Sequence, residues 1–377
     1  MRRVFYLTGT RADFGLMLPT LREVHARAGL SVEIAVTGMH LSTKFGATAS
    51  EVHACGLPVV AQWPVDVDTD DGSAMARSAA AVASVSAAYF GDRRPDICLL
   101  LGDRWEMLAT AMSAVLTGLP VVHLCGGDLS GSVDDAIRHA ISKLAHVHAV
   151  ATPGSAERLR RMGEPEDRIH VVGAPGLVGL EVLASVPRGD WASDIGLDPG
   201  DPIAAVLFHP VVQDAPDAGH QMTQVLDAVL AEHFQVLCLM PNADAGSDGI
   251  RKAINDARER HAALRVVTHL PRQTYVSVLA GADVLVGNSS SGIVEAASFG
   301  TPVVNVGDRQ EGRERNANTQ DVPVDSAAIR HALQVARRWP RHRRDNVYGD
   351  GRTHVRVADL LVGLPLGAGL LKKPMTY

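Results

Sequence analysis

Residues 97–124 read ICLLLGDRWEMLATAMSAVLTGLPVVHL, and three kinds of segment are visible in them. The runs Ile97–Leu101 and Val121–Leu124 are continuously apolar, which is typical of parallel strands buried on both faces. Between them, Glu106–Thr117 has a helical pattern, and Gly118 follows at the point where a helix commonly ends. The stretch therefore predicts one strand–helix–strand unit of a parallel sheet.

The same alternation continues on both sides of this unit. In the first half the further segments are the strand-like runs Val4–Leu7 and Val32–Val36 and the helical patterns Leu16–Ala28, Met75–Phe90 and Asp134–Ala145. In the second half the strand-like runs are Ala204–Phe208, Val236–Met240, Leu264–Val267, Val284–Val286 and Val303–Val306, with a helix predicted over Met222–Glu232. Two successive series predict an α/β chain of two Rossmann-like, doubly wound domains.

The domain boundaries follow from where the first series stops. The stretch 173–202 is rich in Gly, Pro and Asp and is predicted to be the linker. We expect domains at residues 1–174 and 175–350, and a C-terminal tail, 351–377, that packs back on the first domain. Because a domain typically contains ~150 residues, a chain of 377 residues also favours two domains.

Composition excludes several classes of protein. The net charge of −6 argues against a nucleic-acid-binding protein, and 4% aromatic residues argue against base stacking. With 46% hydrophobic residues the chain is not mainly disordered. The four cysteines are far apart, so neither a zinc module nor a disulfide framework is expected. No apolar run approaches the roughly 18 residues of a membrane helix, so we expect a soluble, cytoplasmic protein without a membrane partner.

In doubly wound folds, ligands bind at the carboxyl ends of the strands. Gly9-Thr10-Arg11-Ala12-Asp13 follows the first strand, and Arg11 beside a helix start suits an anion. The alternative is that Asp13 caps the helix and pairs with Arg11. Gly102-Asp103-Arg104 follows another strand and offers a reactive carboxylate and a phosphate clamp, or simply an ion pair.

The segment from His123 to His139 is the richest in polar groups. Ser132 and Asp135 resemble a capping box, and Asp134 and Arg138 are neighbours on a helix surface. Capping accounts for Asp135 but not for Gly126-Gly127-Asp128 beside His123. We therefore favour a functional site here.

Three strand ends in the second half carry further candidates. His209 follows one strand, where it is either a ligand or a packed core residue, and Asn242 lies in an Asx-rich loop after another. Gly287-Asn-Ser289-Ser290-Ser-Gly292 runs from a strand into a helix and predicts a phosphate site, against the alternative of an ordinary helix cap. Glu295 would accept hydrogen bonds from ribose hydroxyls, and Arg309 would reach the same phosphates. Neither a Walker motif nor a G-x-G-x-x-G after the first strand is present.

Taken together, these motifs resemble the hydrolysing UDP-N-acetylglucosamine 2-epimerases of the sialic-acid-pathway type. The matching motifs, in order, are G-T-R-A-D (9–13), L-G-D-R (101–104), G-G-D-x-S-G-S-x-D-D-x-I-R-H-A-I (126–141), F-H-P (208–210), P-N-A-D-A-G-S (241–247) and G-N-S-S-S-G (287–292). The resemblance implies a GT-B-like fold with a nucleotide sugar in a cleft between the two domains. It also implies the reaction: UDP is eliminated from UDP-N-acetylglucosamine, and hydration with inversion at C2 gives free N-acetylmannosamine.

The resemblance implies roles for particular residues. The catalytic group would be Asp103, Asp134, Cys125, His209 and Arg138. The nucleotide would be held by Arg11, Arg104, Asn242, Ser289, Ser290, Glu295 and Arg309, with His209 steadying the departing phosphate. No metal and no cofactor is implied, and the partners are a nucleotide sugar or nucleoside and further copies of the chain in a homodimer or homotetramer.

One position departs from the family pattern. Cys125 stands where the family carries a glutamate that transfers a proton, and Gly-Gly-Asp replaces the usual Gly-Gly-Glu. A thiol can move a proton, but its reference pKa is about 8.5 and it is not a carboxylate. The departure leaves open an elimination-only lyase or dehydratase on a related nucleoside or nucleotide sugar. The motifs also leave open a GT-B glycosyltransferase and a regulator that only binds a nucleotide sugar.

Overall fold

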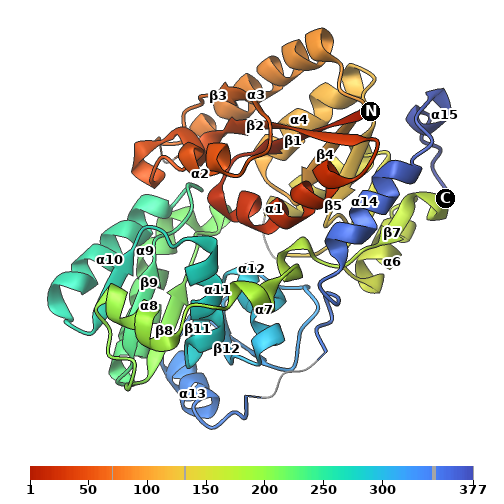
Figure 1. Ribbon diagram of the computed structural model, residues 1–377. Coiled ribbons are helices and arrows are strands. Elements are labelled where there is room, and N and C mark those ends of the chain that lie inside the picture. The colour runs from red at the N-terminus through yellow and green to blue at the C-terminus, as the bar shows by residue number, and fades with distance from the viewer. Residues whose placement is uncertain (70, 131–132, 342–344, 377) are drawn as a thin grey trace. The chain divides into compact units, whose positions relative to one another are not determined.

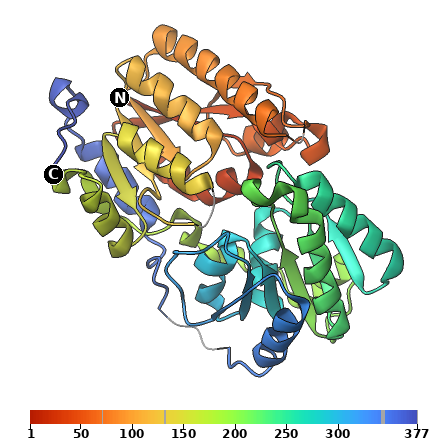
Figure 2. The ribbon, with the colours of Figure 1, turned by 180° about the vertical axis from the view of Figure 1, so that it is seen from behind.

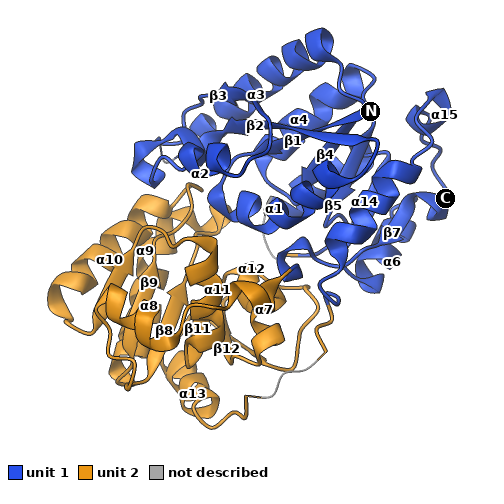
Figure 3. Ribbon diagram, viewed as in Figure 1, with its two compact units in different colours: residues 1–129, 133–178, 348–377 blue, residues 130–132, 179–347 orange. Residues whose placement is uncertain are grey.

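A computed structural model describes residues 1–69, 71–130, 133–341 and 345–376 (Figure 1). The chain forms two compact units (Figure 3). Unit 1 comprises residues 1–129, 133–178 and 348–377, and unit 2 comprises residues 130–132 and 179–347. Within the described ranges, no helix is both long and apolar enough to cross a membrane.

Unit 1 is built on a seven-stranded sheet in which every neighbouring pair is parallel. Its strands are β1 (Arg2–Thr8), β2 (Leu30–Thr37), β3 (Val59–Trp63), β4 (Ile97–Leu101), β5 (Val121–Leu124), β6 (Val147–Val150) and β7 (Ile169–Val171). Its α-helices are α1 (Arg11–Ala26), α2 (Ala49–Ala54), α3 (Gly72–Arg93), α4 (Trp105–Leu116), α5 (Val133–Leu144), α6 (Pro153–Arg161), α14 (Thr353–Gly363) and α15 (Ala368–Leu371).

The core of unit 1 explains why its central strands are so apolar. All residues of β4 and β5 are buried, because helices cover both faces of the sheet. Helices α3, α4 and α5 pack in a row, whereas α14 packs beside α1. Val357, Ala358 and Leu361 of α14 belong to the same buried cluster as the residues of β1 and β2. Helix α14, near the C-terminus, thus completes the hydrophobic core that α1, β1 and β2 form near the N-terminus.

Unit 2 repeats this architecture with six parallel strands. Its strands are β8 (Ile203–Leu207), β9 (Gln235–Leu239), β10 (Leu264–Val267), β11 (Val284–Gly287), β12 (Val303–Val306) and β13 (Thr319–Val322). Its α-helices are α7 (Leu180–Leu183), α8 (Arg188–Ile195), α9 (Ala218–Ala231), α10 (Ser247–Arg260), α11 (Arg272–Gly281), α12 (Ser290–Val294) and α13 (Ser326–Ala336). Figure 2 shows helices α9, α10 and α13 of this unit from behind.

Strand order fixes where a ligand can bind in each unit. The sheets run β3-β2-β1-β4-β5-β6-β7 and β10-β9-β8-β11-β12-β13, so the order reverses between β1 and β4 and between β8 and β11. Ligands of doubly wound sheets bind beyond the carboxyl ends of the strands at such a reversal. The loops that follow β1, β4, β8 and β11 are therefore the first places to look for a site.

Two parallel-sheet α/β domains are confirmed, and some details of the predicted elements are corrected. The stretch 173–202, predicted to be a linker, contains α7 and α8. Helix α1 begins at Arg11 rather than at Leu16, because Thr10 and Asp13 cap it in a reciprocal pair. Strands β3, β6, β7 and β13 were not predicted. They are short or lie towards the sheet edges, and polar residues such as His148 and Gln320 interrupt them.

Candidate active site

A buried arginine joins three polar segments of unit 1. Arg138, in α5, is 1% exposed, and its guanidinium donates to the carboxylate of Asp103 after β4. It also donates to Oδ1 of Asp135 at 2.6 Å and to the backbone carbonyl of Asp128 at 2.9 Å. Burial opposes the positive charge, but the aspartates outweigh burial and raise the pKa of Arg138. The carboxyl ends of β4 and β5 thus meet at a permanent cation.

The two carboxylates on Arg138 keep some access to solvent. The side chains of Asp103 and Asp135 are 25% and 24% exposed. Asp134 is half-buried in the first turn of α5, next to Asp135. The structure thus brings Asp103 and Arg138 into direct contact. It places Asp134 in the first turn of α5, the helix that carries Arg138. Ser132, the predicted capping residue, lies outside the described residues.

His123 is a neutral structural link in this cluster. It is fully buried, and its Nε2 lies 2.7 Å from the carbonyl oxygen of Gly102, which can only accept. Nε2 therefore carries the proton, and Nδ1 accepts from the Ser142 hydroxyl at 3.2 Å. Burial lowers the pKa of His123 to about 3. A ring that stays neutral cannot act as the acid, so Asp103, Asp134 and Cys125 are the better candidates for proton transfer.

Cys125 ends β5 in an unusual backbone conformation. Its φ of 59° lies in the left-handed region, which residues other than glycine seldom adopt. Its N–H donates to the carbonyl of Ala149 at 3.1 Å, so the turn is tied to the neighbouring strand. Its side chain is only partly buried, against the unit 1 core. The thiol is thus held at the strand end where the family pattern predicts a glutamate.

The two glycines after Cys125 allow close packing. A Cβ at Gly127, whose φ is +75°, would lie 2.3 Å from the backbone oxygen of Ser155. Asp128 is buried beside them and accepts from the Ser155 hydroxyl at 2.6 Å. The Gly-Gly-Asp segment therefore ties β5 to the start of α6 as well as to Arg138.

The arginines predicted to bind phosphate in unit 1 have acidic partners. Arg11 pairs with Glu51, with Nε 2.9 Å from Oε2, rather than with Asp13. Asp13 caps α1 from its third helical position, accepting from the Thr10 N–H at 2.7 Å. Arg104 lies 3.0 Å from the buried carboxylate of Glu106, whose pKa is raised by burial. An incoming phosphate would share or displace these carboxylates.

In unit 2, His209 and Asn288 lock the ends of β8 and β11 together. The His209 N–H donates to Oδ1 of Asn288 at 2.7 Å, and Nδ2 of Asn288 donates to the His209 carbonyl at 2.8 Å. The Asn242 N–H approaches Nδ1 of His209 at 3.3 Å. Nδ1 therefore accepts, and the ring proton of neutral His209 sits on Nε2. The structure brings His209 and Asn242 together at neighbouring strand ends of unit 2.

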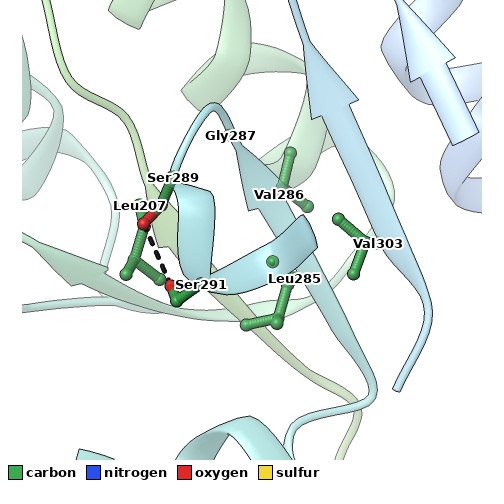
Figure 4. A pocket seen from close by; sticks show the side chains of 8 residues that line it. Leu207, Leu285, Val286, Gly287, Ser289, Ser291 and Val303 are labelled. Carbon is green, nitrogen blue, oxygen red and sulfur yellow. Dashed lines mark hydrogen bonds between the residues drawn. The ribbon is translucent and has the colours of Figure 1, made fainter. Parts of the chain in front are cut away.

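The serine loop after β11 begins α12. Ser289 is the N-cap and Ser290 the first helical residue, and the hydroxyls of Ser289 and Ser291 lie 3.0 Å apart. Figure 4 shows both hydroxyls at a small pocket whose other lining residues are mostly apolar. Arg309 donates to the Asn288 carbonyl at 3.1 Å, which brings its guanidinium to the same loop.

Glu295, predicted to accept hydrogen bonds from ribose hydroxyls, lies one turn further along the chain. Its carboxylate is buried and paired with Arg272 of α11. The Tyr275 hydroxyl, one turn along α11, contacts Ser291. Sequence reasoning missed Arg272, Tyr275, Glu51 and Glu106, because each acts through a partner on another segment and no local motif marks it. Among the residues that the structure describes, no three His, Cys, Asp or Glu side chains are grouped so that they could hold a metal ion.

Comparison with known proteins identifies the family. Residues 22–362 match the family described as UDP-N-acetylglucosamine 2-epimerase. The chain belongs to the UDP-N-acetylglucosamine 2-epimerase family. It is accordingly an enzyme of the UDP-sugar 2-epimerase type, and neither a glycosyltransferase nor a binding-only regulator is supported.

Three relatives that are named for an enzymatic activity align with most of this chain. A UDP-N,N′-diacetylbacillosamine 2-epimerase (hydrolyzing) from Legionella pneumophila is 43% identical over 100% of both chains. A GDP/UDP-N,N′-diacetylbacillosamine 2-epimerase (hydrolyzing) from Campylobacter jejuni is 30% identical over 86% of this chain and 85% of that protein. A UDP-N-acetylglucosamine 2-epimerase from Neisseria meningitidis is 30% identical over 94% of this chain and 92% of that protein.

A solved structure of the family supports the fold. The UDP-GlcNAc 2-epimerase from Neisseria meningitidis bound to UDP-GlcNAc superposes with a TM-score of 0.81 at 15% identity, over 96% of this chain and 99% of that one. The GT-B-like fold, built from two parallel-sheet domains, is therefore shared with this protein of low sequence identity.

Replacing Arg138 by methionine is expected to lower the free energy of unfolding of this epimerase by about 3 kcal/mol. The substitution leaves Asp103, Asp135 and a buried carbonyl without their common donor. The loss falls at the lower end of the range for a broken buried pair, because both carboxylates are a quarter exposed. Urea unfolding followed by circular dichroism measures it.

Arg160→Met is the matched control for this experiment. Arg160 lies on α6 and pairs only with the exposed carboxylates of Glu157 and Glu166. Its replacement is expected to leave the unfolding midpoint nearly unchanged. Equal unfolding curves for the Arg138 variant and the parent would show that the cluster does not stabilise unit 1.

Proposed function

We propose that this epimerase converts a UDP-linked N-acetylated amino sugar and water into UDP and the free sugar inverted at C2. The observation that carries the proposal is the set of carboxylates at the ends of β4 and β5, with Asp103 held on buried Arg138. Elimination followed by hydration needs groups that remove a proton from C2 and return one to the other face. Asp103 and Asp134 are the groups that we propose for these proton transfers.

We propose a division of labour between the two units. Unit 2 would hold UDP through Ser289, Ser290, Arg309 and the pair His209–Asn242. In unit 1, Asp103 or Asp134 would take the C2 proton as the C1–O bond to UDP breaks, which gives a glycal. Water would then add its hydroxyl to C1 while C2 receives a proton on the opposite face. Substrate plus water thus balances UDP plus the free sugar.

For the sugar, we propose UDP-N,N′-diacetylbacillosamine, whose name denotes two N-acetyl groups where N-acetylglucosamine has one. Support comes from a full-length relative at 43% identity and a second at 30% that are both named for this sugar. The alternative is UDP-N-acetylglucosamine, which gives N-acetylmannosamine and which the family description and the Neisseria relative name. The cytoplasmic location and the homodimer or homotetramer stay predictions.

Parallel incubations with the two UDP sugars test this choice. UDP release and the free sugar are followed by ¹H NMR in deuterated water, where a proton returned to C2 comes from solvent and appears as deuterium. We expect turnover of the diacetylated sugar to exceed that of UDP-N-acetylglucosamine. Preference for UDP-N-acetylglucosamine would overturn the substrate proposal and leave the reaction type standing.

A second candidate function rests on Cys125. If the thiol cannot return the proton, the reaction stops after elimination, as in a lyase. The same NMR experiment separates the two functions, because a lyase accumulates the glycal and UDP without a free C2-inverted sugar. Accumulation of the glycal at the rate of UDP release would favour the lyase.

Arg309→Ala is expected to weaken UDP binding by about 1.5–3 kcal/mol, the range for a charged hydrogen bond. The side chain ends at the Asn288 carbonyl of the serine loop, where it would contact a phosphate. Isothermal titration with UDP measures the change. Arg330→Ala is the control, because Arg330 lies on α13 and pairs with Glu232 at the end of α9. Equal UDP affinity for the Arg309 variant and the parent would remove Arg309 from the site.

A further inference from the structure

Unit 1 contains a fully buried carboxylate that the proposed reaction does not use. Glu164 follows α6, and its side chain is 0% exposed. Its oxygens lie 2.9 Å from Nε2 of His148, 2.8 Å from Nζ of Lys143 and 2.5 Å from Nζ of Lys373. Burial would raise the pKa of Glu164, but these three groups lower it to about 2. An ionised carboxylate in such a place depends on its cationic partners.

Lys373 has a second role at the end of a helix. Its Nζ donates to the backbone carbonyls of Ser142 at 2.8 Å and Lys143 at 3.0 Å. These carbonyls belong to the last turn of α5, where a helix has no internal donors left and where a cation is favourable. One ammonium group therefore caps α5 and also pairs with Glu164, together with Lys143.

The segment that carries Lys373, residues 368–376, is bound to unit 1 along its length; we call it the C-terminal strap. Arg168 donates to the backbone carbonyls of three strap residues, Gly369, Leu370 and Lys372. The N–H of Thr376 donates to the Gly163 carbonyl at 3.0 Å. Figures 1 and 2 both show the C-terminus beside α6. The strap is thus placed by backbone contacts that do not involve Glu164.

Two routes lead from Lys373 to the candidate active site. The first is α5 itself, which is capped by Lys373 at its last turn and carries Arg138 and Asp134 near its first. The second runs through Ser142, whose hydroxyl contacts His123, the residue that holds the Gly102 carbonyl beside Asp103. His148, whose Nε2 contacts Glu164, is also the register partner of His123 in the pairing of β5 with β6.

We propose that Lys373 is a positioning residue for the epimerase reaction, holding α5 so that Arg138 presents Asp103 correctly. The inference rests on the proposed function only in taking Asp103 and Arg138 as part of the reacting site. It assigns the strap a role in turnover but none in binding UDP, because the division of labour proposed above holds UDP through residues of unit 2.

Steady-state kinetics of Lys373→Met test the assignment. We expect kcat to fall about 10-fold while the Kd for UDP stays within 2-fold of the parent, and Lys373→Arg to recover most of the loss. The control is Lys372→Met, since the side chain of Lys372 is exposed and its hydrogen bonds to Arg168 and Ala368 are made by its backbone. An unchanged kcat in Lys373→Met would overturn the proposal. So would a parallel loss of UDP affinity, or an arginine variant no better than the methionine variant.

Hydrogen–deuterium exchange gives a readout that needs no substrate. Residues 133–144 are expected to exchange faster in Lys373→Met than in the parent, with Lys372→Met unchanged. If Lys373→Met does not fold, Arg168→Ala loosens the strap while keeping all groups on Glu164, and faster exchange of the same residues is expected. Unchanged exchange of α5 in the folded variants would overturn the proposal. Failure of the parent to turn over any UDP sugar would instead contradict the proposed function, and the exchange result would still stand.

Discussion

Asp103→Asn is expected to lower the rate of UDP release by about 10²–10⁴-fold, the range for loss of a general acid or base. Asparagine has the shape of aspartate and its amide oxygen can still accept from Arg138, but it cannot take a proton. The carboxylate follows β4 at the reversal of strand order and is a quarter exposed, so a substrate can reach it. Initial rates with the preferred UDP sugar measure the effect.

Asp359→Asn serves as the control for Asp103→Asn. Asp359 is an exposed residue of α14 whose carboxylate pairs with Arg27, and its replacement is expected to leave turnover unchanged. UDP titration of the Asp103 variant should give the parent Kd, which separates lost chemistry from lost binding. Turnover at the parent rate in Asp103→Asn would mean that Asp103 only holds Arg138.

Cys125→Ala is expected to lower formation of the free sugar by about 10²-fold or more if the thiol transfers a proton in place of the usual carboxylate. Cys125→Glu should then keep or raise that rate. Cysteine, alanine and glutamate all carry a Cβ at a φ of 59°, so the backbone strain at this position is common to the parent and both variants. NMR of the free sugar and of UDP follows both variants.

The matched control is Cys55→Ala, which removes the other half-buried thiol of unit 1, a sulfur that accepts from the Leu57 N–H. It is expected to retain parent activity. Full activity in Cys125→Ala would exclude the thiol from proton transfer. Full activity in both Cys125→Ala and Asp103→Asn would identify the strand-end cluster as structural, and the reacting groups would have to be sought elsewhere.

The strands that sequence reasoning found are short runs rich in Val, Ile and Leu, and β4, β5 and β12 among them are buried along their whole length. Ile97–Leu101, Val121–Leu124, Leu264–Val267 and Val303–Val306 were predicted with the bounds that β4, β5, β10 and β12 have. Strand β13 reads Thr-Gln-Asp-Val and lies at a sheet edge, where pairing of the backbone rather than burial holds it. Its sequence therefore carries no hydrophobic signal.

The candidate site was predictable as a set of loops but not as a set of contacts. Strand ends followed by Gly, Asp and Ser are visible along the chain, whereas the partner of each charge is not. Arg138 and Asp103 are 35 residues apart, and Glu295 and Arg272 are 23 apart. Only the folded sheet order shows that Arg138 meets Asp103 and that Glu295 is already neutralised.

The chain order within unit 1 has a consequence for biosynthesis. Unit 2 is formed almost entirely by one continuous run, residues 179–347, whereas unit 1 takes its last segment, 348–377, from beyond it. A ribosome that has released residues 1–178 has not yet made α14, so Val24 and Leu21 of α1 lack the apolar cover that Val357 and Leu361 later supply. Unit 2 emerges whole during that interval. The nascent first half thus exposes a hydrophobic helix face until α14 has left the ribosome, and this is the period in which a chaperone would have a surface to bind.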